Sequence, residues 1–175
     1  MELSGAWRAA PANDELRRTF HEPELDDRGW VPVEVPGHWS SHAELSESRA
    51  VLHRIGFELD RPAAGRRTWL TFDGIAQQGD VWLDGGYVGD TDGYFVPHHF
   101  EITDLLGEDR AHLLAVDVSC ARFGDTDGRT SMTGALQDPE LSGAAGENPG
   151  GIWRPVRIRE TGPTAIRFFR AICLD

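Results

Sequence analysis

The sequence predicts an all-β fold, an antiparallel β-sandwich or jelly roll. Short segments in which apolar and polar residues alternate recur about every 8–12 residues. Turn residues separate these segments, since the 175 residues include 20 Gly and 10 Pro. No window of about 11 or more residues carries an apolar stripe at helical spacing. Together, these patterns favour many short strands over helices.

The elements expected in the first half of the chain begin with a polar, weakly patterned segment up to residue 27. Its spaced apolar residues, Leu16, Phe20 and Leu25, indicate one short helix or a loop laid over the core. Alternation then predicts strands around residues 31–35, 55–59, 69–73, 81–83 and 87–88. The last two strands flank Asp84-Gly85 and are expected to form a hairpin, because its tight turn needs positive φ.

Further strands are expected around residues 100–102, 114–118, 152–158 and 166–168, with a one-turn helix at 104–106. Two irregular segments, 38–49 and 122–150, interrupt the rhythm, and a connection as long as the second is usually functional or disordered. The turn at 161–163 is interpreted as a linker. Residues 1–160 would then form one domain, and 161–175 would be a linker and the first strand of another, as in a piece of a longer protein.

The charge balance excludes some classes of partner. Acidic residues number 29 against 17 basic residues, and the net charge is −12. Neither nucleic acid nor an anionic membrane is expected to bind, because their phosphates would be repelled. The chain has no apolar run of about 18 residues and no signal pattern at its start, so we expect a cytoplasmic protein. Cys120 and Cys173 lie at alternating positions of apolar segments and are interpreted as buried free thiols.

The sequence contains no self-sufficient catalytic motif. There is no G-x-S-x-G elbow and no glycine-rich phosphate loop. The candidates for a zinc site are His38 and His42, which lie near Glu44. A zinc ion needs three or four converging ligands. We therefore interpret these histidines, together with His98 and His99, as surface and loop residues. We therefore expect neither metal nor cofactor. The numerous carboxylates are interpreted as a solvated surface rather than a glycosidase pair, and the strand-borne Trp residues as packing rather than sugar platforms.

Three stretches of the sequence resemble the N-terminal sugar-binding domain of family 2 glycoside hydrolases, which include β-galactosidases, β-glucuronidases and β-mannosidases. Residues 30–39, WVPVEVPGHW, are similar to the family's opening W-x-x-x-x-V-P-G-x-W. Residues 68–103 resemble its L-x-F-x-G-[IV] strand, its V-W-[LV]-N-G-x-x-V-G hairpin and its F-[DE]-[IV]-T strand. Residues 148–158, NPGGIWRPVRI, are close to its G-G-I-[WF]-R-x-V signature, in which Gly151, Trp153 and Arg154 are the structural residues.

This resemblance implies a jelly roll of the galactose-binding-domain-like type. In the family, this domain precedes an immunoglobulin-like sandwich and a catalytic barrel, and residues 161–175 would begin that sandwich. Both catalytic carboxylates lie in the barrel, so none of the residues of this chain is expected to be catalytic. The implied function is that of a non-catalytic domain of a retaining exo-β-glycosidase, which hydrolyses O-glycosidic bonds of β-linked sugars. A free-standing carbohydrate-binding module and a purely structural packing domain are the alternatives.

Two departures from the family pattern bear on the site. Asp84 stands in the hairpin where the family more often has Asn, and both residues tolerate the turn geometry. Several members carry an Asp before the G-I-x-R segment that reaches the substrate, whereas this chain has Ala144, Ala145 and Gly146 there. Since binding residues concentrate on loops, the candidates for the sugar side are Glu147, Asn148, His42 and Glu44.

Arg154 is expected to point inward, because Ile152, Val156 and Ile158 share its alternation. A buried Arg needs a carboxylate partner or an aromatic ring to stack on, and its replacement by Ala should then cost about 2–4 kcal/mol of stability.

Overall fold

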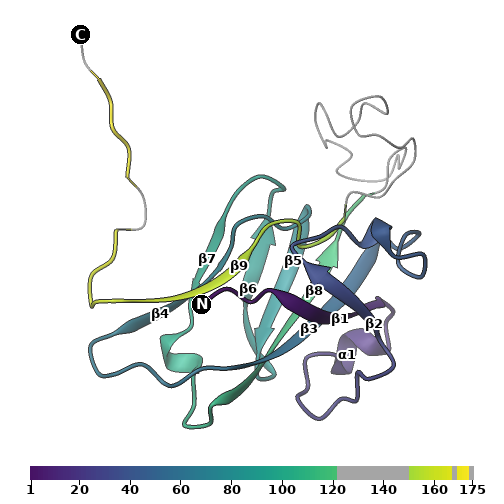
Figure 1. The fold of residues 1–175 in the computed structure, drawn as a ribbon, viewed down its shortest axis with the longest axis horizontal. Helices are drawn as coiled ribbons and strands as arrows, with labels where there is room; N and C mark the ends of the chain where they lie inside the picture. Colours follow the sequence, from purple (N-terminus) through teal and green to yellow (C-terminus); the bar gives the residue numbers. More distant parts are fainter. Residues whose placement is uncertain (122–149, 167–168, 174–175) are drawn as a thin grey trace.

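The computed structural model describes residues 1–121, 150–166 and 169–173, and its strands form a two-layered β-sandwich (Figure 1). The helices are single turns, α1 (Leu16–Thr19), η1 (Trp39–Ser41) and η2 (Thr103–Leu105). The strands of the described residues are β1 (Gly5–Pro11), β2 (Val31–Val35), β3 (Ala50–Glu58), β4 (Arg67–Phe72), β5 (Gln78–Leu83), β6 (Gly86–Asp92), β7 (His98–Glu101), β8 (Ala111–Ser119) and β9 (Val156–Thr161).

The strands build two sheets in which every pairing is antiparallel. The larger sheet has the order β2-β1-β3-β8-β5-β6, and the smaller has the order β7-β4-β9. The predicted all-β antiparallel sandwich is therefore confirmed. The hairpin predicted at Asp84-Gly85 joins β5 to β6, and both of its turn residues have positive φ, as this tight turn requires.

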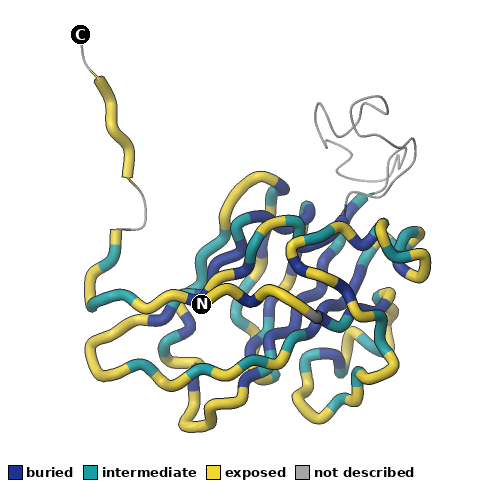
Figure 2. The backbone as a smooth tube through the Cα atoms, viewed as in Figure 1, coloured by how far each residue is buried: buried dark blue, intermediate teal, exposed yellow. Residues whose placement is uncertain are grey.

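The core lies between the two sheets, where alternate side chains of facing strands pack together. Figure 2 shows the buried residues concentrated along the strands of both layers. The larger sheet contributes Trp7, Ala9, Val33, Val35, Val51, Val81, Leu83, Leu114, Val116 and Val118 to one apolar cluster, and the smaller contributes Leu70, Phe72, Val156 and Ile158.

A second, smaller cluster lies on the outer face of the larger sheet, beneath the segment between β1 and β2. Phe20 from this segment packs with Leu52 of β3 and Ala115 of β8, and all three are buried. Leu16 and Leu25 pack against the same cluster. The expectation of a short helix or loop laid over the core is confirmed, and the larger sheet is therefore covered on both faces over β3 and β8.

Three details differ from the sequence-based expectations. β1 was not predicted, yet it lies inside the larger sheet between β2 and β3. The strand expected to begin at Ile152 begins at Val156. Cys120 is a buried free thiol as expected, but Cys173 is exposed. The expectation was wrong for Cys173 because the described residues beyond Thr161 pair with no strand of the sandwich.

The strand expected at 166–168 lies mostly outside the described residues, and the division into two domains stays a prediction. Within the described part of the chain, no helix has the length and apolar character that crossing a membrane requires.

Candidate functional site

Three segments that are far apart in the sequence meet at one end of the sandwich. We call this contact the motif junction, and it comprises residues 35–39, 74–76 and 150–154. Backbone hydrogen bonds join the first segment to the third, from Gly37 N to Ile152 O (2.9 Å) and from Trp39 N to Gly150 O (3.0 Å). Others join the second to the third, from Ala76 N to Gly151 O (2.9 Å) and from Arg154 N to Gly74 O (3.2 Å). The junction therefore unites motifs from all three stretches that carry the family resemblance.

Two glycines allow this close approach. Gly151 has a φ of +147°, and a Cβ at this position would overlap the carbonyl oxygen of Gly37. A Cβ on Gly150 would overlap the indole of Trp39, which is buried. The indole Nε1 of Trp39 has no hydrogen-bond partner among the described residues. Packing against glycine backbone, rather than a polar contact, therefore holds this ring.

Gly151→Ala should lower the free energy of unfolding by about 1–3 kcal/mol, because it imposes both a strained φ and an overlap with Gly37. The matched control is Gly29→Ala, since a Cβ on Gly29 would meet no atom within 4 Å and this glycine has no positive φ. Urea unfolding of the two variants provides the comparison. Equal unfolding midpoints for both variants would show that the junction tolerates a side chain.

An aromatic cluster lies beside the junction and extends to the surface. The ring of Trp153 stacks with Tyr94 at a centroid distance of 5.1 Å and meets Phe95 edge-on at 5.7 Å. Trp153 Nε1 donates a hydrogen bond to Tyr94 O at 3.1 Å, and the ring of His38 stacks at 6.5 Å. Burial raises the pKa of the Tyr94 phenol, so this group stays neutral near pH 7. The Trp153 ring therefore packs within this aromatic cluster, and a structural role for it stays a prediction.

Arg154 lies on this cluster and is exposed, so the inward orientation predicted for it is wrong. Its guanidinium carbon is 4.5 Å from the centroid of the Trp153 ring, which confirms the stacking that was expected as one of two alternatives. The error arises because residues 152–155 are not in a strand. The alternation that places Val156 and Ile158 in the core therefore does not extend back to Arg154, and the argument for a large stability cost does not apply to it.

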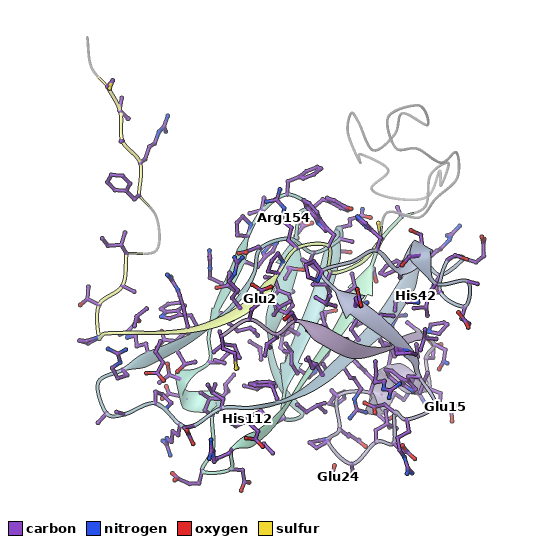
Figure 3. The ribbon with its side chains drawn as sticks, viewed as in Figure 1. Glu2, Glu15, Glu24, His42, His112 and Arg154 are labelled. Atoms are coloured by element: carbon purple, nitrogen blue, oxygen red, sulfur yellow. The ribbon has the colours of Figure 1, made fainter. Side chains whose placement is uncertain are left out.

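Of the four candidate sugar-side residues, Glu147 and Asn148 lie outside the described residues. His42 is half-buried directly after η1 and, with Gly37 and Glu34, lines an open groove of about 620 Å³. Glu44 is exposed. Figure 3 shows His42 apart from Arg154, so the structure does not bring these two residues together.

The two irregular segments nevertheless adjoin each other at their described ends. Cys120 N donates a hydrogen bond to Arg49 O at 2.9 Å, and Trp39 N donates one to Gly150 O at 3.0 Å. Residues on either side of 122–149 therefore contact the segment 38–49. This arrangement agrees with the expectation that both segments belong to the same end of the sandwich.

The hairpin residue Asp84 has a role that the sequence did not reveal. Its Oδ1 accepts a hydrogen bond from Leu113 N at 2.7 Å, and its Oδ2 lies 2.6 Å from Nδ1 of the buried His112. Because a carboxylate only accepts hydrogen bonds, His112 Nδ1 carries the proton. This pairing ties the hairpin to β8 and gives a physical reason for Asp at a position where the family more often has Asn. Within the described residues, no group of three or more His, Cys, Asp or Glu side chains is placed to hold a metal ion.

Comparisons with known proteins agree with the resemblance. The sequence profile described as "Glycosyl hydrolase 2 galactose-binding domain-like" matches residues 47–132. A β-galactosidase from Clostridium acetobutylicum is 30% identical over 143 residues, which are 66% of this chain and 16% of that protein. β-Mannosidase B from Emericella nidulans is 33% identical over 116 residues, which are 66% of this chain and 13% of that protein.

Solved structures show the same fold. The β-glucuronidase of Bifidobacterium dentium superposes with a TM-score of 0.65 and 25% identity, over 93% of this chain and 30% of that one. The chain thus spans less than a third of the length of each of these relatives. Residues 47–132 of the chain thus match the galactose-binding domain-like family of glycosyl hydrolase 2.

Proposed function

We propose that this chain acts as the non-catalytic N-terminal sugar-binding domain of a retaining exo-β-glycosidase. In that enzyme it shapes one wall of the substrate pocket and supports a catalytic barrel. The observation that carries this proposal is the motif junction, which gathers the family motifs at one end of the sandwich and exposes an aromatic cluster there. Relatives that match this chain include a β-galactosidase and a β-mannosidase, each several times longer than the matched region.

The partners in this proposal are a β-linked glycoside and the remaining domains of the same polypeptide, an immunoglobulin-like sandwich and a barrel. Support comes from residues 162–166 and 169–173, which extend away from the sandwich (Figure 1). They expose Ile166, Phe169 and Ile172, and exposed apolar side chains in series are typical of a surface that another element covers. The cytoplasm remains the proposed location, because the free thiols of Cys120 and Cys173 fit a reducing compartment.

Glu147 and Asn148, with His42 and Glu44, are proposed to face the sugar. In the complete enzyme, Glu147→Ala should raise KM for a p-nitrophenyl β-glycoside about tenfold, because a hydrogen bond from a sugar hydroxyl to a carboxylate contributes about 1.5 kcal/mol. We expect KM for the same substrate to rise also in the variants Asn148→Ala and His42→Ala. The kinetic constants are measured with galactoside, glucuronide and mannoside substrates, since the sugar is not specified by these motifs.

The matched control is Glu24→Ala. Glu24 is exposed in the segment between β1 and β2, far from Arg154 in Figure 3, so its loss should leave both constants unchanged. If Glu147→Ala and His42→Ala behave like Glu24→Ala, neither residue contacts the sugar and only the supporting role remains.

A further inference from the structure

Arg154 is exposed, but its guanidinium is held in place. It stacks on Trp153, and that ring is fixed by its stacking with Tyr94 and by its hydrogen bond to Tyr94 O. The backbone of Arg154 is also tied to Gly74 O. Stacking occupies the flat face of a guanidinium and leaves the N–H donors at its edge available for a planar acceptor such as a carboxylate. Arg154 thus presents N–H donors whose orientation is already fixed in the isolated domain.

No carboxylate of the described residues pairs with Arg154, although several exposed arginines of the same chain have such partners. Arg61 pairs with Glu108 at 2.6 Å, and Arg110 pairs with Asp60 at 2.8 Å. In a chain with 29 acidic residues, an ordered Arg without an acidic neighbour is a candidate for a contact outside the chain.

Apolar side chains are exposed beside Trp153, the ring on which this cation stacks. Phe95 and Val96, in the loop between β6 and β7, are 59% and 53% exposed. Phe95 packs edge-on against Trp153, so it belongs to the same rigid cluster as Arg154. Exposed aromatic residues beside an Arg are the composition typical of the centre of a protein–protein interface. Because the cluster is already ordered, binding through it costs little conformational entropy.

We propose that Arg154, Phe95 and Val96 form the docking surface through which this domain binds the remaining part of the same polypeptide. The facing surface supplies an apolar pocket for Phe95 and a carboxylate for Arg154. The chain covers only 13–30% of the length of the matched relatives. An enzyme of that length has further residues from which this facing surface can be built. A phosphate-bearing partner is disfavoured by the net charge of −12. The proposal rests on the proposed function, because it assumes that this domain is part of a longer enzyme.

Arginine labelling with a phenylglyoxal reagent tests this contact, with mass spectrometry of the labelled peptides. The rate at Arg154 is measured in the complete enzyme and in the 175-residue chain. We expect Arg154 to react at least tenfold more slowly in the complete enzyme. Arg159, which is exposed on β9, is the internal control and should react at similar rates in both. Equal rates at Arg154 in both proteins would overturn the proposal.

Two further outcomes would assign the surface to another occupant and would also overturn the proposal. Protection of Arg154 that grows with the concentration of the 175-residue chain would indicate a second copy of the chain. Protection that appears when a β-glycoside is added to that chain would indicate a sugar site.

A pair of charge-reversal variants supplies an independent measurement. Arg154→Glu should lower the melting temperature of the complete enzyme by about 3 °C more than that of the 175-residue chain, in which it removes only the stacking on Trp153. Arg159→Glu should lower neither.

The proposed function and the docking surface can be refuted independently of each other. A complete protein that hydrolyses no glycoside but protects Arg154 would defeat the proposed function and leave the docking surface supported. An active glycosidase with unprotected Arg154 would defeat only the docking surface.

Discussion

Arg54→Ala is expected to lower the free energy of unfolding by about 3–5 kcal/mol, because it removes a buried guanidinium that donates two hydrogen bonds to backbone oxygens and pairs with the half-buried Asp27. Arg54 lies on β3 and is only 2% exposed. Its Nη1 and Nη2 donate hydrogen bonds to Leu25 O and Glu22 O, each at 3.2 Å, and its Nε is 3.2 Å from Asp27 Oδ2. These contacts fasten the segment between β1 and β2 to the outer face of the larger sheet.

Urea unfolding of the purified chain measures this cost. Arg61→Ala is the matched control, because Arg61 also pairs with a carboxylate but is exposed, and exposed pairs contribute about 1 kcal/mol or less. If Arg54→Ala does not fold, Arg54→Met keeps much of the side-chain volume and provides the same comparison. Equal costs for the variants at positions 54 and 61 would show that the covering segment does not depend on Arg54.

The second large effect is a loss of stability in acid that depends on His53. This residue is buried in β3 beside Trp39, and its Nδ1 lies 3.1 Å from Val51 O. Burial lowers the pKa of His53 to about 4, against 6.5 for the unfolded chain. Between pH 6.5 and about 4, the His53 imidazole is therefore protonated in the unfolded state and neutral in the folded state. Stability should fall by about 3 kcal/mol as the pH drops from 6.5 through 4, and no further below that pH from this group.

His53→Leu should remove this component, since Leu has no group to protonate. Carboxylates also titrate in this range, but they do so in both proteins, so the quantity measured is the difference between their free energies of unfolding at each pH. His98→Gln is the matched control, because it also removes a histidine from a strand but one that is only half-buried. Parallel stability curves for the original chain and His53→Leu would contradict this account of His53.

The sequence predicted most of the strands but missed the first half of β3, where both faces are covered. In β3, Leu52 and Arg54 are buried under the segment between β1 and β2, while Val51 and His53 are buried in the core. Alternation disappears when both faces are apolar or tightly packed, so only the outer half of β3, around 55–59, was visible as a strand. The strand β1 was missed for a similar reason, because its sequence GAWRAAP alternates only weakly.

The candidate site was predictable only as a set of motifs. Their order along the chain does not reveal that residues 35–39, 74–76 and 150–154 share backbone hydrogen bonds, because that contact follows from the sheet topology. The position of Arg154 was wrong because the alternation of β9 was extended back over residues 152–155, which are not in a strand. His53 was missed because it lies in the first half of β3, which the sequence does not reveal as a strand.

The central claim is that this chain is a non-catalytic domain, and an assay of the purified 175-residue chain tests it most directly. A retaining glycosidase needs two carboxyl groups about 5–5.5 Å apart, and we propose that both lie in a barrel outside this chain. With p-nitrophenyl β-galactoside, β-glucuronide and β-mannoside, the chain should release no more nitrophenol than buffer does. Nitrophenol release that co-elutes with the 19.4 kDa protein through successive chromatography steps would contradict the claim.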